Sequence, residues 1–106
     1  MRIGNSELTR NIDNYCINEL KIPSIVLMEN AAIKVVKNID FEKFKSFTIV
    51  CGTGNNGGDG LAVARQLFSM NMQIDVFIVG NNSMSKDCNV NYDILKNMGI
   101  NINHII

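Results

Sequence analysis

The sequence predicts an α/β protein with a parallel sheet and flanking helices, and three observations lead to this prediction. Short runs rich in β-branched and aromatic residues alternate with segments of helical spacing. The run at 73–79 is apolar almost throughout, as in a parallel strand that is covered on both faces. A glycine-rich segment, VCGTGNNGGDGLAVAR at 50–65, joins the first run to the next helix. This order is typical of βαβ units with right-handed crossovers.

Two amphipathic helices are predicted before the first strand. Over residues 5–20, apolar residues such as Ile12 and Cys16 fall at spacings of three and four, on one face of a helix. A second helix is predicted over 25–39, with Ser24 as its N-cap. We expect most of the apolar surface of both helices to pack into the core.

The remainder of the chain is predicted to form the sheet and the helices that connect its strands. Strands are expected at 46–51, 73–79 and 102–106, helices at 61–70 and 88–99, a glycine loop at 52–60 and a polar loop at 81–87. Gly99 is expected to end the last helix. A three-stranded parallel sheet leaves an edge open, so we expect residues 1–106 to be the first half of a doubly wound domain, truncated after its third strand.

Composition excludes several classes of function. Ten basic residues balance ten acidic ones, so no positively charged surface for nucleic acid or for a membrane is expected. No apolar run reaches the roughly 18 residues of a transmembrane helix, and the N-terminus lacks the apolar stretch of a secretory signal. Cys16, Cys51 and Cys88 are widely spaced and odd in number, which predicts reduced thiols in the cytoplasm. His104, the only histidine, is expected to be structural.

The glycine-rich segment is the candidate ligand site. Gly52, Gly54 and Gly57 satisfy the pattern G-x-G-x-x-G between a predicted strand and a predicted helix. Glycines let backbone N–H groups come close to a ligand, and the start of a helix attracts an anion. A nucleotide that carries a pyrophosphate is therefore the expected ligand.

Polar side chains in the same segment indicate that the ligand carries hydroxyl groups or is accompanied by a cation. Asn55, Asn56 and Asp59 offer oxygens for sugar hydroxyls or for a monovalent cation. The acidic residue that follows the second strand in a conventional dinucleotide site is missing, and so is the Lys-Ser/Thr pair of a nucleotide triphosphate P-loop. A structural alternative treats Asn56 and Gly57 as a turn and Asp59 as a helix cap. It explains single residues but not the cluster, since a plain βα connection needs only about 2–6 residues.

The sequence GTGNNGGDGLAVAR resembles the signature of the NAD(P)H-hydrate epimerase family, the YjeF N-terminal domain. Two other segments are similar to that family: ELKIPSIVLMENAA at the second helix, and KDCNVNYDILKNMG with Asn91 and Tyr92. The resemblance spans essentially the whole chain. It implies a Rossmann-like fold and an isomerase that interconverts the R and S epimers of NADHX and NADPHX, the hydrated forms of NADH and NADPH, in cofactor repair.

The resemblance also implies site residues and partners. By motif matching, Asn55, Asn56, Gly57, Gly58 and Asp59 would contact the hydrate, and Asn56 would also bind a potassium ion. The family further implies a homodimer, and an ADP- or ATP-dependent NAD(P)H-hydrate dehydratase as a fused domain or as a working partner.

Family members continue beyond the length of this chain. Their later strands carry V-D-A-x-x-G-T-G and V-D-x-P-S-G segments with ligand-binding aspartates, and neither segment occurs here. We therefore expect the chain to be the N-terminal half of an epimerase domain and to be inactive alone, with its catalytic residues unassigned. Asp59 is the only acid in the loop, and a binding role fits it better than a catalytic one. The alternative is a non-enzymatic nucleotide-binding or interaction module that keeps the loop without the chemistry.

Overall fold

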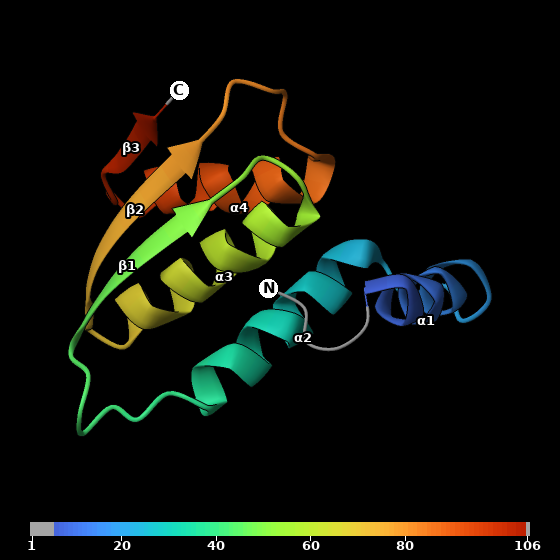
Figure 1. Ribbon diagram of the computed structural model, residues 1–106, viewed down its shortest axis with the longest axis horizontal. Helices are drawn as coiled ribbons and strands as arrows, with labels where there is room; N and C mark the ends of the chain where they lie inside the picture. Colours follow the sequence, from blue (N-terminus) through green and yellow to red (C-terminus); the bar gives the residue numbers. More distant parts are fainter. Residues whose placement is uncertain (1–5, 106) are drawn as a thin grey trace.

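A computed structural model describes residues 6–105, with side chains from residue 11 onward except that of Asp13 (Figure 1). Residues 5 and 106, where the first predicted helix begins and the last predicted strand ends, lie outside this range. The predicted order of two helices followed by alternating strands and helices is confirmed. The elements are α1 (Ser6–Asn18), α2 (Ser24–Lys37), β1 (Ser46–Cys51), α3 (Asn55–Ser69), β2 (Gln73–Val79), α4 (Lys86–Asn97) and β3 (Ile102–Ile105).

The strands form one parallel sheet, as the alternation of strands and helices predicts, and their order in the sheet is β1-β2-β3. Ser46 lies opposite Gln73 at the start of the β1–β2 ladder, and Val76 lies opposite Ile102 at the start of the β2–β3 ladder. Helices α3 and α4 make the two crossovers between neighbouring parallel strands. Across residues 6–105, no strand pairs with the second edge of β1.

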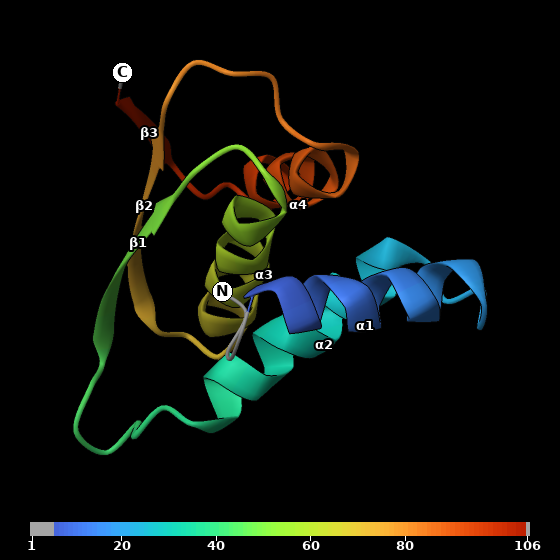
Figure 2. The same ribbon diagram turned by 45° about the vertical axis from the view of Figure 1, so that its right-hand side comes forward.

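The helices that pack on the sheet all lie on one of its faces. Figure 2 shows the sheet nearly edge-on, with α2, α3 and α4 on the same side. Side chains alternate accordingly: Val76 and Ile78 are buried under the helices, whereas Asp75 and Val79 are exposed on the other face. The prediction that β2 is covered on both faces is therefore wrong for the part of the chain that the structure describes.

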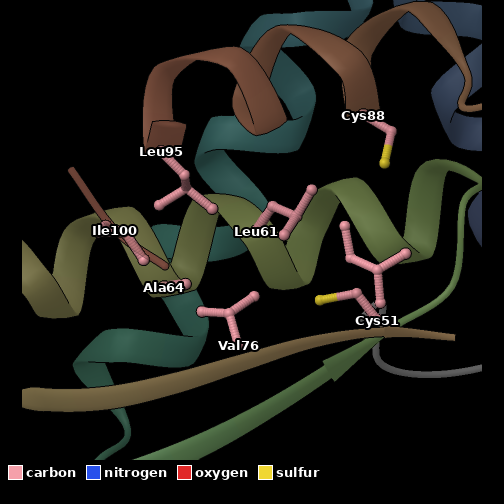
Figure 3. Packing of buried hydrophobic residues seen from close by; sticks show 8 residues of the cluster. Cys51, Leu61, Ala64, Val76, Cys88, Leu95 and Ile100 are labelled. Atoms are coloured by element: carbon pink, nitrogen blue, oxygen red, sulfur yellow. The ribbon is translucent and has the colours of Figure 1, made fainter. Parts of the chain in front are cut away.

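Helix α3 is the centre of the molecule, because two apolar clusters share it. One cluster lies between α3, α4 and the sheet, and Figure 3 shows Leu61, Ala64 and Leu95 pointing toward one another there. The other lies between α2, α3 and β1, where Ala32 and Ala62 are completely buried. Such small residues allow α2 and α3 to pack closely.

The first helix differs from its prediction. Among its described side chains, Ile12 and Tyr15 are each more than half exposed, and Leu20 just after the helix is equally exposed. In the described part of the chain α1 packs on α2 and leaves this apolar face outside the core. None of the described helices is long and apolar enough to cross a bilayer.

Three helix starts also differ from the sequence prediction. Helix α2 begins at Ser24 with Pro23 as its N-cap, so Ser24 does not cap it. Helix α4 begins earlier than predicted, because Ser85 caps it: its side chain accepts a hydrogen bond from the N–H of Cys88 at 3.2 Å. Helix α3 begins at Asn55, so most of the predicted glycine loop is helical. Gly99 follows α4 with φ +82°, which confirms its predicted role.

Candidate functional site

The predicted ligand segment connects β1 to α3 at the carboxyl edge of the sheet. Only residues 52–54 separate the last residue of β1 from the first residue of α3. Gly54 is the N-cap and has no side chain with which to cap the helix. The N–H of Gly58 donates to the carbonyl of Gly54 at 3.0 Å. The N–H groups before Gly58 therefore precede the helical hydrogen bonds, and with the helix dipole they make the start of α3 suitable for an anion.

Two glycines of the first turn of α3 are required by close packing. A Cβ atom on Gly57 would lie 2.5 Å from the carbonyl carbon of Gly52, which is a clash with backbone. A Cβ atom on Gly58 would lie 2.5 Å from Cε of Met28 and 3.1 Å from Cα of Cys88. Helix α3 therefore approaches the end of β1, helix α2 and helix α4 without room for a methyl group. These contacts explain why glycines with poor helix propensity stand inside a helix.

The other two glycines of the G-x-G-x-x-G pattern have open space around them. A Cβ atom on Gly52 or on Gly54 would meet no atom within 4 Å. Gly54 has φ −85° and ψ −165°, a conformation that any residue adopts. Neither contacts within the described chain nor backbone strain at Gly54 therefore requires glycine here. Close approach of a ligand is the remaining physical reason for small residues at these positions.

The five predicted site residues lie together at the start of α3 but differ in access. Asn55 and Asn56 are exposed, whereas Gly57, Gly58 and Asp59 are buried, Asp59 with 0 % exposure. The structural alternative is wrong on both counts, because Asn56 and Gly57 are helical and Asp59 is the fifth residue of α3. Among these five residues, only Asn55 and Asn56 have side chains whose polar atoms a ligand can reach.

A second loop, which the glycine-rich motif does not include, lies at the same edge of the sheet. The N–H of Ser85 donates to the carbonyl of Thr53 at 2.9 Å, which ties the start of α4 to the turn after β1. Two helix starts therefore lie side by side at the carboxyl ends of β1 and β2. A parallel sheet collects the loops after its strands at one edge, and the capping serine before α4 was the available signal.

A polar network connects three helices behind the site. Glu29 of α2 forms an ion pair with Arg65 of α3 and accepts a hydrogen bond from Nε2 of Gln66 at 2.6 Å. Asn91 of α4 is 3 % exposed; its Oδ1 accepts from Nε of Arg65 at 3.5 Å, and its Nδ2 donates to Sδ of Met28 at 3.3 Å. We call these residues the Glu29–Asn91 network. It fixes the side chain of Met28, and this side chain packs against Gly58.

We expect Asn91→Leu to lower the free energy of unfolding by about 1–2 kcal/mol, because it removes the acceptor of Arg65 and the donor to Met28 inside a buried site. Asn89→Leu is the matched control, since Asn89 lies on the exposed side of the same helix. Urea unfolding followed by circular dichroism measures both. Equal unfolding midpoints for the two variants would contradict the role of the network.

Cys51 and Cys88 are buried, and Cys16, Cys51 and Cys88 are all free thiols, in agreement with the prediction that the cysteines form no disulfide framework. Burial, with a smaller contribution from Cys88, raises the pKa of the Cys51 thiol from 9.0 to about 11. Burial also raises the pKa of the Cys88 thiol. Neither thiol is therefore a nucleophile at neutral pH.

Stability is expected to fall at alkaline pH because of Cys51. The folded chain favours the protonated thiol. Its contribution to the free energy of unfolding is therefore fully present below pH 9 and is lost as the pH rises through about 11. The expected loss is about 2 kcal/mol over that interval. The slope of unfolding free energy against pH, compared between the chain and Cys51→Ala, measures it. The same slope in both would show that burial of this thiol does not govern the response.

Sequence comparison places this fold and site in a known family. A family model described as YjeF-related protein N-terminus matches residues 24–106. The chain is 46% identical over 99 residues to the NAD(P)H-hydrate epimerase of Anaerococcus prevotii, covering 92% of this chain and 45% of that protein. It is 38% identical to the NAD(P)H-hydrate epimerase of Oenococcus oeni, covering 90% and 47%. It is 40% identical to the bifunctional NAD(P)H-hydrate repair enzyme Nnr of Moorella thermoacetica, covering 83% and 18%.

Structural comparison agrees on the fold. The crystal structure of the yeast protein ynu0, YNL200c, matches 98% of this chain and 47% of its own length, with a TM-score of 0.73 and 24% sequence identity. The chain thus spans under half the length of these relatives. The matched family, the identities and the fold lead to one conclusion: the chain belongs to the family of YjeF-related N-terminal domains.

Proposed function

We propose that this chain supplies the substrate-binding half of an NAD(P)H-hydrate epimerase, an isomerase that interconverts the R and S epimers of NADHX and NADPHX. The observation that carries the proposal is the exposed pair Asn55 and Asn56 at the start of α3, beside two glycines with open space around them. The names of the Anaerococcus and Oenococcus relatives support it. The reaction serves the repair of nicotinamide cofactors.

The proposed roles follow from which residues a ligand can reach at the carboxyl edge of the sheet. The N–H groups at the start of α3 bind the pyrophosphate, and Gly52 and Gly54 allow the ligand to approach the backbone. The amides of Asn55 and Asn56 bind hydroxyl groups of the substrate. Asp59 is fully buried, so its proposed role is to hold the turn in place for the ligand. Gly57 and Gly58 bind through backbone atoms.

Epimerisation requires a proton donor and acceptor near the carbon that carries the hydroxyl group, which leaves and returns on the opposite face of the ring. Asn55 and Asn56, the exposed side chains at the start of α3, are amides and do not exchange protons at neutral pH. The acid and base are therefore proposed to come from residues outside this chain, and the chain alone is proposed to be inactive.

A potassium ion is proposed to bind at Asn56. The ion needs hard oxygen ligands, and the exposed amide of Asn56 offers one. When bound there, the cation would offset negative charge on the substrate. We further propose a cytoplasmic homodimer. The bifunctional relative from Moorella thermoacetica supports a partnership with an NAD(P)H-hydrate dehydratase.

The test compares two polypeptides on purified (R)-NADHX with potassium chloride. One is this chain, and the other is this chain continued by the second half of the Anaerococcus prevotii relative. We expect the continued chain to form the S epimer faster than the uncatalysed reaction, and this chain alone to leave that rate unchanged. Chromatographic separation of the epimers gives the rates.

Variants of the continued chain then test the site. We expect Asn56→Leu to lower kcat/KM by about 100-fold, and Asn30→Leu, at an exposed position on α2, to leave it unchanged. Replacing potassium by a large organic cation is expected to reproduce part of the Asn56→Leu loss. No S epimer from either polypeptide would overturn the proposal in favour of a non-enzymatic nucleotide-binding module.

A further inference from the structure

Asn56 and Gly57 form the only asparagine–glycine pair in the sequence. The backbone nitrogen that follows an asparagine can attack the side-chain amide, and a glycine in that position has no Cβ atom to obstruct the attack. Two features of this site bring the pair together. Close packing against Gly52 excludes a side chain at residue 57, and residue 56 presents an exposed amide. The fold therefore places a chemically labile pair at the candidate site.

The attacking nitrogen, that of Gly57, is not held by the helix. Asn56 and Gly57 are the second and third residues of α3, and the N–H of Gly58 donates to the carbonyl of the N-cap, Gly54. The N–H of Gly57 therefore precedes the helical hydrogen bonds. The positive end of the helix dipole lies at the same place and favours the deprotonated nitrogen, which is the form that attacks.

The first turn of α3 is also suited to brief opening. A helical backbone holds the side-chain carbon of Asn56 away from the following nitrogen, so the attack requires this turn to open. Residues 57, 58 and 60 are glycines, which have poor helix propensity, and Gly54 offers no side-chain cap. Helix ends of this kind open locally while the rest of the fold remains intact.

We propose that Asn56 is a deamidation site, at which the side-chain amide is lost in water by way of a cyclic imide. Hydroxide removes the proton from the Gly57 nitrogen, and this nitrogen forms a bond to Cγ of Asn56. The bond between Cγ and Nδ2 breaks, and the leaving nitrogen takes a proton from water and departs as ammonia. Water then opens the imide at one of its two carbonyl carbons. The product is aspartate or isoaspartate, with one water consumed and one ammonia released.

Deamidation changes the charge of the candidate site. Either product places a carboxylate at the start of α3, where the helix dipole stabilises it. The same carboxylate repels the phosphates of a dinucleotide, and isoaspartate also lengthens the main chain before Gly57. A ligand that binds the N–H groups of this turn holds it closed and protects Asn56. The effect on binding rests on the proposed function, whereas the deamidation itself does not.

The experiment incubates the folded chain at neutral pH, and peptide mass spectrometry follows the conversion of amide to acid at each asparagine. Asn55 is the internal control, because it is exposed on the same turn but is followed by a residue with a side chain. Asn56 is expected to convert at least about 10-fold faster than Asn55, since only Asn56 is followed by a residue without Cβ. This comparison requires no variant to fold.

Two glutamine variants identify the reacting residue. Asn56→Gln keeps the amide but lengthens the side chain, so the five-membered imide cannot form, and conversion at this position is expected to stop. Asn55→Gln is the matched control and is expected to leave the rate at Asn56 unchanged. Circular dichroism verifies that both variants fold. In the continued chain, Asn56→Asp is expected to reproduce the raised KM for NADHX of a fully deamidated sample.

Two outcomes would overturn the deamidation site. They are equal rates at Asn55 and Asn56, and conversion of Asn56 in the urea-unfolded chain alone, which would mean that the first turn of α3 stays closed. Saturating NADHX is expected to slow the conversion several-fold. Conversion of Asn56 at a rate that NADHX does not change would support the deamidation site and contradict the proposed ligand site, so the two can fail separately.

Discussion

Replacing Gly57 by alanine is expected to lower the free energy of unfolding by about 2–3 kcal/mol. The added Cβ would lie 2.5 Å from the carbonyl carbon of Gly52, and that carbonyl belongs to the backbone directly after β1. The neighbouring residue Cys51 is paired with Ile78 in the sheet, so the turn cannot move away without disturbing the ladder. Overpacking typically costs about 1–3 kcal/mol, and a methyl group forced against backbone that cannot shift costs at least the upper end of that range. The better helix propensity of alanine returns only about 1 kcal/mol.

Gly54→Ala is the matched control for Gly57→Ala. It adds the same methyl group three residues earlier, at a position where a Cβ meets no atom within 4 Å and φ is −85°. Its unfolding free energy is expected to stay within about 0.5 kcal/mol of the parent value. In the continued chain, Gly54→Ala is instead expected to raise KM, because the methyl group occupies the space proposed for the ligand. Urea unfolding and steady-state kinetics separate the two effects.

Equal unfolding midpoints for Gly57→Ala and Gly54→Ala would contradict the close contact between the first turn of α3 and Gly52. A loss of stability in both would mean that Gly54 is also packed within the chain. The expected pattern, stability lost at one glycine and binding lost at the other, would show that one motif contains glycines of two kinds.

The strands and their alternation with helices could be predicted from the sequence because the signals are local. The bounds 46–51 and 73–79 agree with β1 and β2, since β-branched runs end at glycine or polar residues there. The start of α3 could not be predicted in this way. Glycine weakens a helix by about 1 kcal/mol per residue relative to alanine, so local propensity argues against a helix at 57–60. Contacts with Met28 and Gly52, remote in sequence or across the turn, decide the outcome.

Only the part of the candidate site that is contiguous in the sequence could be predicted. Asn55 to Asp59 stand in one segment, so a motif marks them, but their burial depends on helices that pack on α3. The Glu29–Asn91 network joins α2, α3 and α4 through side chains of irregular spacing, and no periodicity indicates it. The exposed face of α1 and the exposed face of β2 were missed for the opposite reason. Apolar periodicity predicts which side chains share a face, and it does not state what covers that face.

The contact between Met28 and Gly58 is expected to appear as a coupling energy in a double-mutant cycle. Met28→Ala alone removes a side chain that is 1% exposed and is expected to cost about 2–4 kcal/mol. Gly58→Ala alone places a Cβ 2.5 Å from Cε of Met28 and 3.1 Å from Cα of Cys88, and is expected to cost about 1–3 kcal/mol. In the double variant the new methyl group enters the space that Met28 leaves, so the combined loss is expected to be about 1–2 kcal/mol smaller than the sum.

Leu67→Ala provides the control cycle, because Leu67 is equally buried on α3 but lies nine residues beyond Gly58, more than about 10 Å along the helix. Gly58→Ala and Leu67→Ala are expected to add within about 0.5 kcal/mol. Urea unfolding of the single and double variants gives both cycles. Additive losses in the Met28 cycle would mean that α2 does not contact the first turn of α3 through this side chain. The Glu29–Asn91 network, which fixes Met28, would then have no route to the site, whereas the expected coupling makes Met28 that route.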